Sequence, residues 1–266
     1  MKFKTRAIAA ATLALAALGA QAHDLWFKPS STVLSSPEWV TVDAAVSNDV
    51  FFFNHRPLAL DNVNVTGPDG AAVEMKNAVK GELRSVFDFK PEKTGTYRVS
   101  MLMNGVMGGY KDGKGQMRRL RGSVDDILKQ IPADAQDVRI TENVRRMETF
   151  VSVGKPSALA VTGKGLELKP ITHPNDLVST EEARFAFLLD GKPAADLEVE
   201  LVADGIRYRD GVNAIKLRTD AQGVLKVKFP HPGLFWLSTD AKDDRTSVAQ
   251  AKERHLGYVA TLEVLP

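Results

Sequence analysis

The chain has 266 residues, with 35 lysines and arginines against 33 aspartates and glutamates, and it has no cysteine. A formal net charge of +2 gives no electrostatic reason to expect a nucleic-acid partner. Without cysteine the protein can form no disulfide, thiolate metal site or iron–sulfur cluster. Any metal must therefore be held by histidine, carboxylate, backbone or terminal-amine groups.

Residues 1–22 have the pattern of a secretory signal peptide. Basic residues lie among the first six positions, an uncharged apolar run follows from 7 to 20, and alanines occupy positions 20 and 22. Signal peptidase requires small residues at these last two positions, so we expect cleavage after Ala22 and a periplasmic location. The alternative, a membrane anchor, needs roughly 20 apolar residues, more than this run provides. The mature chain would carry 32 basic and 33 acidic residues and no membrane span.

The first half of the mature chain has the period-two alternation of β-strands. Apolar and polar residues alternate from Val40 to Val46, and further strands are predicted over 62–66, 83–89 and 96–103. Gly67-Pro68-Asp69-Gly70 is strong turn chemistry, because glycine accepts a positive φ and proline fixes its own. Short strands joined by tight turns predict an antiparallel sandwich.

Residues 104–122 interrupt this rhythm with five glycines between 105 and 115 and then three arginines. Two interpretations are open. The segment is either a mobile basic loop that meets an anionic partner or a solvated hairpin extension, and we favour the extension because clustered like charges are commonly just exposed. Ser123 should cap a short helix that runs to about Gln130. A long strand over 138–153 should then return to the first sheet.

The alternation resumes after Gly154-Lys155-Pro156, where we predict the boundary between two domains, 23–154 and 155–266. About seven strands with glycine- and proline-containing turns favour a second sandwich in the C-terminal part. The sequence therefore predicts an all-β protein of two tandem immunoglobulin-like or transthyretin-like β-sandwich domains, with one short helix in an insertion.

Several short motifs recur in a known pattern. His23-Asp24-Leu25-Trp26 opens the predicted mature chain, and characteristic segments follow at 165–170, 173–177, 190–193 and 219–223, the last ahead of a Pro-Gly pair. Together they resemble a bacterial periplasmic family, domain of unknown function 4198, over nearly the whole mature chain. Members of that family are often associated with nickel or cobalt uptake. The resemblance therefore implies a periplasmic metal-handling accessory with transthyretin-like sandwiches.

His23 is the strongest candidate metal ligand. Cleavage after Ala22 would give it a free amine and an imidazole, with ordinary pKa values of about 7.7–8.0 and 6.5, so both can lose their protons near neutral pH. Two nitrogen donors suit copper, nickel or cobalt better than magnesium or calcium. Asp24 and Asp49 are candidate carboxylate ligands. The alternative is that His23 simply follows the cleavage site.

His55 is the second candidate imidazole, and it follows three consecutive phenylalanines at 51–53. In one interpretation it lies in a site at the end of the sandwich, where loops commonly carry function. In the other, Phe51 and Phe53 close the end of the sandwich and His55 is only a turn residue.

His173 is the third candidate, with Asp176 placed to orient its ring. Because Pro174 keeps His173 extended, a structural role at the domain junction is favoured instead.

Two further patterns are predicted to be structural. Arg207-Tyr208-Arg209 could hold an anion, but its alternation is more typical of an exposed edge strand. Trp26, Trp39 and Trp236 could form a sugar-binding platform, but each lies in or beside a strand pattern, and we expect all three in the core.

The most consistent hypothesis is a non-catalytic periplasmic accessory protein. It would bind a divalent transition metal (Ni, Co or Cu) or a metal chelate for uptake or homeostasis, with an envelope transporter as a candidate partner. One alternative is a metal-free module that binds envelope partners or glycans. The other is a copper enzyme with a histidine brace that acts oxidatively on a polymer. The sequence has no nucleophile elbow, phosphate loop or calcium-loop spacing to suggest other chemistry.

Overall fold

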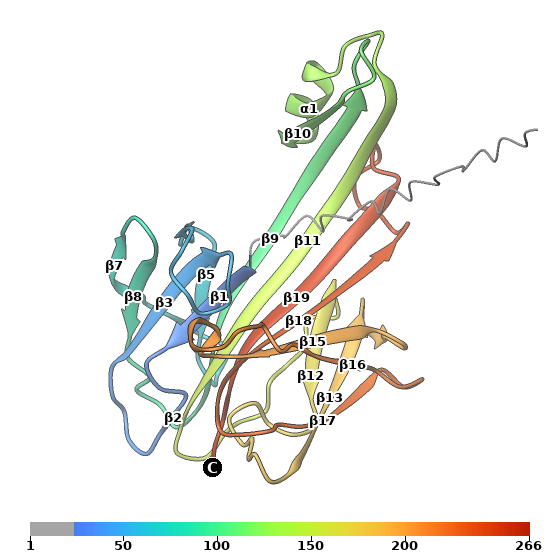
Figure 1. Ribbon diagram of the computed structural model, residues 1–266. Helices are drawn as coiled ribbons and strands as arrows, with labels where there is room; N and C mark the ends of the chain where they lie inside the picture. Colours follow the sequence, from blue (N-terminus) through green and yellow to red (C-terminus); the bar gives the residue numbers. More distant parts are fainter. Residues whose placement is uncertain (1–23) are drawn as a thin grey trace, which may run out of the picture.

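The computed structural model describes residues 24–266, and in this range the protein is built almost entirely of β-strands (Figure 1). The strands form three sheets, of five, ten and four strands. Helical structure within residues 24–266 is limited to α1 (Val124–Gln130) and the 3₁₀ turn η1 (Ile206–Tyr208). No helix in this range is long and apolar enough to span a bilayer. The predicted all-β sandwich fold with one short helix is confirmed.

The five-stranded sheet belongs to the N-terminal half. Its strands are β1 (Asp24–Pro29), β3 (Val40–Ser47), β4 (Arg56–Pro57), β7 (Lys76–Lys80) and β8 (Ser85–Phe89). They are ordered β1-β3-β8-β7, with β4 also on β3, and all pairings are antiparallel. The apolar residues predicted to alternate along β3 are buried.

The ten-stranded sheet is the central layer, and both halves of the chain contribute to it. Its strands are β2 (Val33–Leu34), β5 (Val63–Thr66), β6 (Ala72–Val73), β9 (Gly95–Lys111), β10 (Met117–Gly122), β11 (Gln136–Val153), β15 (Glu198–Ala203), β16 (Ile215–Arg218), β18 (Gly233–Asp243) and β19 (Glu253–Val264). The order is β16-β15-β18-β19-β11-β9-β5-β6, with β10 on β9 and β2 on β11.

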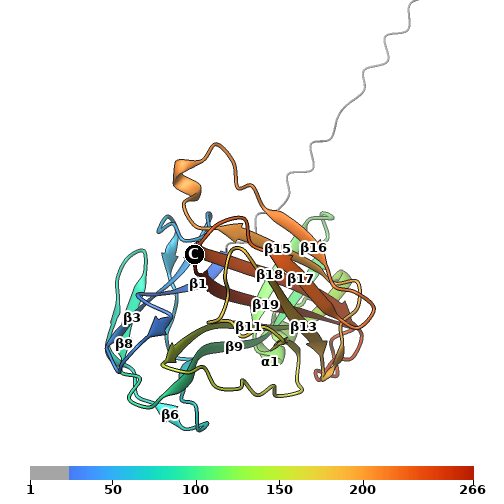
Figure 2. The same cartoon turned by 90° about the horizontal axis from the view of Figure 1, so that it is seen from below.

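The four-stranded sheet lies wholly in the C-terminal half. It consists of β12 (Leu166–Pro170), β13 (Glu182–Leu189), β14 (Lys192–Pro193) and β17 (Val224–Lys228). In Figure 1 this sheet and the five-stranded sheet lie on opposite sides of β9, β11 and β19, and the view from below in Figure 2 agrees.

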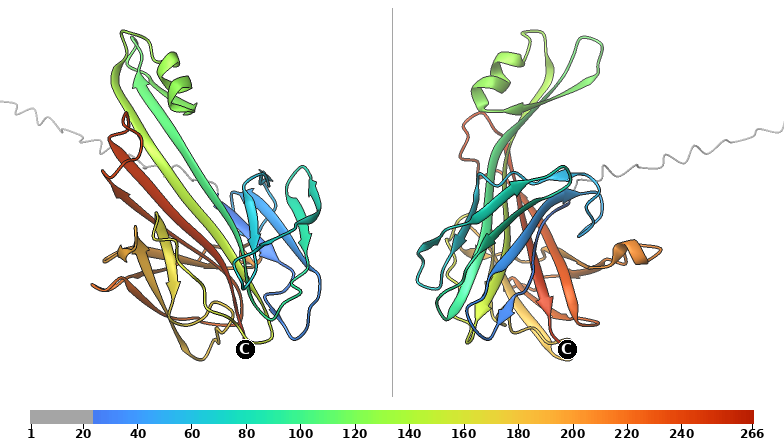
Figure 3. Two further views of the ribbon diagram at one scale, coloured as in Figure 1. Left: turned by 180° about the vertical axis from the view of Figure 1, so that it is seen from behind. Right: turned by 90° about the vertical axis from the view of Figure 1, so that its left-hand side faces the viewer.

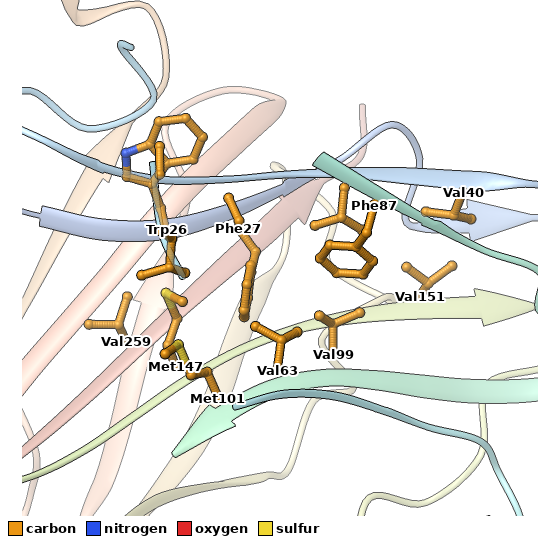
Figure 4. Packing of buried hydrophobic residues seen from close by; sticks show 14 of the residues in the cluster. Trp26, Phe27, Val40, Val63, Phe87, Val99, Met101, Met147, Val151 and Val259 are labelled. Carbon is orange, nitrogen blue, oxygen red and sulfur yellow. The ribbon is translucent and has the colours of Figure 1, made fainter. Parts of the chain in front are cut away.

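The two main hydrophobic cores occupy opposite faces of the central sheet. In β18, Trp236 belongs to the first core while its neighbours Phe235 and Leu237 belong to the second, and β15 divides in the same way between Val202 and Leu201. This follows from the two-residue period of a strand, whose successive side chains point to opposite faces. Figure 4 shows the first core, where side chains of β1 and β8 pack over methionines and valines of the central sheet.

The two halves are joined by a parallel pairing of β11 with β19, from Thr141 opposite Glu253 to Thr149 opposite Thr261. The sheet therefore runs without interruption across the boundary predicted between residues 154 and 155. That division stays a prediction, and the continuity of the sheet across it was not predicted.

A buried ionic network holds the 155–165 segment against the central sheet. Arg146 lies 3.7 Å from Glu148 and 3.5 Å from Glu167, and the Tyr258 hydroxyl donates to Glu148 at 2.8 Å. Glu167 also accepts hydrogen bonds from the backbone of residues 162–164. The guanidinium of Arg146 is thus shared between two carboxylates that are almost fully buried.

The segment that contains residues 104–122 is a hairpin extension, as favoured from the sequence. The outer ends of β9 and β11, with β10 and α1, form a projecting structure that we call the arm (Figures 1 and 3). Ser123 caps α1 as predicted, since its hydroxyl accepts from the amide of Asp126 at 3.2 Å. The helix packs close to β9 because Gly108 lacks a side chain. A Cβ there would lie 2.5 Å from Ile127.

Two local predictions from the sequence are wrong. Arg207-Tyr208-Arg209 is not an edge strand, because η1 and a loop occupy this region and Arg209 donates to the backbone oxygens of 203 and 204. Trp26 and Trp236 are buried, but Trp39 is 53% exposed. Trp39 directly precedes the inward-facing Val40, so its side chain falls on the outer face of the sheet.

We expect Arg146→Met to lower the free energy of unfolding by about 3–5 kcal/mol, because buried Glu167 loses its ion-pair partner, while Glu148 keeps Arg98, 3.6 Å away, as its cation. Urea unfolding measures this loss. Arg218→Met is the matched control, since Arg218 makes ion pairs with Asp196 and Glu198 while 55% exposed. Each such exposed ion pair should contribute only about 0–1 kcal/mol to the free energy of unfolding. Similar losses in the two variants would contradict a stabilising role for the buried network.

Candidate functional site

The start of β1 is fixed against the loop that follows β3. Asp24 is opposite Ser47 in the antiparallel pairing of these strands. The Trp26 indole donates to the Ser47 hydroxyl at 2.7 Å, and that hydroxyl donates to the backbone oxygen of Asp49 at 2.6 Å. The start of β1 is thereby held beside residues 48–55.

The 48–55 loop closes one end of the first core. Phe51 and Phe53 pack around Trp26, with ring centroids 5.4 and 5.1 Å away, and Phe52 turns outward to stack with the Arg207 guanidinium at 5.1 Å. The φ of +60° at Phe51 lets the chain turn sharply enough for this arrangement. Phe51 and Phe53 therefore close this end of the first core, as one of the two interpretations predicted, and the role of His55 stays a prediction.

Asp49 is held in place inside this loop. The Asn54 side-chain amide donates to the Asp49 carboxylate at 2.7 Å, and the same Asn54 side chain accepts from the amide of Asn48 at 2.9 Å. His55 comes directly after Asn54 and is exposed, in a bend that leads into β4.

Carboxylates from three segments converge near the start of β1. Asp24 is half-buried and interacts electrostatically with Glu200 of β15 and with Asp49, while Arg145 of β11 is the positive group that acts on it. Burial, followed by the charge of Glu200, raises the pKa of Asp24 from its ordinary 3.8 to about 7, and Arg145 offsets only part of this rise. Burial is thus the main reason that Asp24 keeps its proton to a higher pH than an ordinary aspartate.

Arg145 also forms an ion pair with a carboxylate of the neighbouring strands. Its guanidinium lies 3.5 Å from Asp240 of β18. Gly257 lies between the two on β19, and a Cβ there would lie 2.8 Å from Arg145 and 2.9 Å from Asp240. The missing side chain leaves room for the pair to form across the sheet.

Asp24 and Asp49, two of the residues selected from the sequence, thus lie within electrostatic reach of each other. His23 falls outside residues 24–266, although it immediately precedes Asp24 in the chain. Within that range, no group of three histidine, aspartate or glutamate side chains is close enough to hold a metal ion.

His173 lies elsewhere. Its Nδ1 accepts from the amide of Asn175 at 3.1 Å, so the proton is on Nε2, which lies 3.1 Å from both the Ser157 carbonyl and the Thr96 hydroxyl. Its ring is oriented by this contact with Asn175, and burial lowers the pKa of His173. Both ring nitrogens are therefore engaged in hydrogen bonds.

His173 is also far from Asp24 along the central sheet. Thr96 pairs with Ser152, seven residues along β11 from Arg145, which corresponds to about 23 Å in a strand. The structure therefore does not bring His173 to the start of β1.

Sequence reasoning missed Glu200, Arg145 and Asp240. Alternation along their strands predicts that all three side chains face away from the second core, but it predicts no neighbour for them. No signal in the sequence indicates that β15 or β11 lies near the start of β1. The pairing of distant strands in the central sheet brings them together.

A pH-dependent loss of stability should come from Asp24. Its folded pKa exceeds its unfolded value of 3.8, so the folded protein binds more protons between about pH 4 and 7, and its stability falls as the pH rises through that window. Asp24→Asn removes this contribution, so its stability relative to the wild type should be greater at pH 8 than at pH 5 in urea unfolding. Asp61→Asn, at an exposed position, is the control. If the difference in unfolding free energy between Asp24→Asn and the wild type were the same at pH 5 and pH 8, the raised pKa of Asp24 would be contradicted.

The comparisons with known proteins give a family but no activity. No curated protein matches the chain. Among solved structures it is similar to the D0–D1 domain of intimin (14% identity, 90% of this chain and 97% of that chain, TM-score 0.23). It is also similar to trypsin-activated alpha-2-macroglobulin from Escherichia coli (12% identity, 92% of this chain and 16% of that chain, TM-score 0.24). A third similar structure is that of the chicken CNTN1 FN1–FN3 domains (8% identity, 91% of this chain and 98% of that chain, TM-score 0.24). At these TM-scores the fold assignment rests on the strand pairing alone. The family model for the domain of unknown function DUF4198 matches residues 20–243, most of the chain, and the protein therefore belongs to this family.

Proposed function

We propose that this protein is a non-catalytic periplasmic accessory that binds a transition-metal ion or metal chelate at its mature N-terminus, for uptake or homeostasis. The observation that carries the proposal is Asp24, which is half-buried, lies near the carboxylates of Glu200 and Asp49, and has a raised pKa although Arg145 is close. A bound cation would offset this negative charge and would displace the proton that Asp24 otherwise retains near neutral pH.

The type of cation depends on His23. Asp24 and Asp49 offer only oxygen donors, which by themselves favour hard ions such as calcium or magnesium. Adjacent Cα atoms are about 3.8 Å apart, so cleavage after Ala22 would place the amine and imidazole of His23 beside this carboxylate group. Two nitrogens with nearby carboxylates suit nickel, cobalt or copper. His55, in the same loop as Asp49, is a further candidate imidazole donor.

The test is calorimetric titration of the mature protein, starting at His23, with Cu²⁺, Ni²⁺ and Co²⁺. A matched protein with one extra alanine before His23 keeps every side chain but converts the amine into a peptide nitrogen. We expect the extended protein to bind at least about tenfold more weakly, because it loses one of the nitrogen ligands. Equal affinity of the two proteins would refute the role of the terminal amine.

Asp24→Asn should weaken the same binding and reduce the number of protons released on metal binding, because the displaced carboxyl proton is removed. Buffers of different ionisation enthalpy measure that release in the titration. Asp61→Asn, an exposed change of the same kind, should leave both quantities unaltered. Unchanged affinity and proton release in Asp24→Asn would exclude Asp24 from the site.

A second function, a metal-free module that contacts other envelope components, is favoured by the arm. The arm projects from both sandwiches and exposes large apolar side chains. Elemental analysis of protein isolated in its processed form separates the two functions, since a metal-free module would carry no bound nickel, cobalt or copper and show no affinity for them.

A further inference from the structure

Three arginines lie on one face of the arm. In the strand register Arg119 of β10 and Arg139 of β11 are both opposite Gly109 of β9, and Arg121 is opposite Met107. α1 packs over the other face, where Gly108 meets Ile127. Because side chains alternate across a strand, the three arginines share the face that α1 leaves open.

Arg119, Arg121 and Arg139 have no ion-pair partner within residues 24–266. Arg118 pairs with Asp112 and Lys111 pairs with Asp137, whereas none of the three forms an ion pair or hydrogen bond with another side chain in that range. Asp137, at the bulge of β11, acts electrostatically on Arg139 but is already paired with Lys111. Like charges on neighbouring strands disfavour the sheet, so the open face would be stabilised by an anion.

Exposed apolar side chains surround the same end of the arm. Met107 and Met117 lie on the open face with the arginines, while Leu128 of α1 and Val138 lie on the other side, and each is between 39% and 50% exposed. A surface for docking one protein would gather its apolar side chains on a single face. Apolar groups on both sides of a projecting end instead suit partial insertion into a layer of lipid headgroups.

We propose that the end of the arm binds the surface of a membrane rich in anionic phospholipid. Guanidinium groups bind phosphate through paired hydrogen bonds, and the methionines, Leu128 and Val138 would contact the boundary between headgroups and acyl chains. The end of the arm projects beyond both sandwiches, so a flat bilayer can reach it (Figures 1 and 3). This proposal does not depend on metal binding.

The test is co-sedimentation of the mature protein, starting at His23, with vesicles of phosphatidylcholine containing about one-third phosphatidylglycerol. Each basic residue near an anionic bilayer strengthens binding about fivefold. The triple variant Arg119→Gln, Arg121→Gln and Arg139→Gln should therefore bind about 100-fold more weakly. The affinity of the wild type should also fall as the salt concentration rises.

The matched control removes three positive charges from the body of the protein, in the variant Lys80→Gln, Arg184→Gln and Lys226→Gln. These side chains are exposed and lie outside the arm. The control should bind as the wild type does, and circular dichroism of both triple variants should match the wild type. The proposal is overturned if the wild type does not sediment with these vesicles, sediments equally with pure phosphatidylcholine, or loses affinity equally in both triple variants.

Discussion

The parallel hydrogen-bonded pairing of β11 with β19 is the interaction on which the rest of this structure depends. It joins the last long strand of the N-terminal half to the last strand of the C-terminal half, so two sandwiches share one central sheet. The first core lies on one face of that sheet and the second on the other. Because parallel neighbours need a long connection, the whole C-terminal sandwich is in effect the crossover between β11 and β19.

This shared sheet also assembles the candidate site. β1 is an edge strand of the five-stranded sheet, and its free side is held against the central sheet where the Trp236 indole donates to the Leu25 carbonyl at 3.0 Å. That contact brings Asp24 over strands from both halves of the chain, near Glu200 and Arg145. A site built in this way exists only when both sandwiches are folded. Any ion bound there would therefore stabilise the joined structure rather than one domain.

The central sheet has different surroundings along its length. Over the sandwiches, buried charged residues of this sheet form ion pairs within the fold, as Arg146 does with Glu148 and Glu167. Beyond them, β9 and β11 continue into the arm, which has only the small cluster around Ile127 and leaves three arginines unpaired. Buried charges without partners are strongly destabilising, so unpaired charge collects where the sheet emerges into solvent. The carboxylate site and the basic end of the arm thus lie in separate regions of one sheet.

The sequence alone determined the strands, the turns and the capped helix, because alternation, glycine–proline turns and the Ser123 cap act between near neighbours. It also marked Asp24, next to the predicted mature N-terminus, and Asp49, in the segment that leads to His55, as candidate ligands. Only the tertiary structure decided that Glu200 and Arg145 join Asp24, that His173 lies about 23 Å along the sheet from them, and that Trp39 faces outward. Strand alternation fixes which face a residue occupies but not which distant strand becomes its neighbour, and that choice belongs to the pairing of β11 with β19.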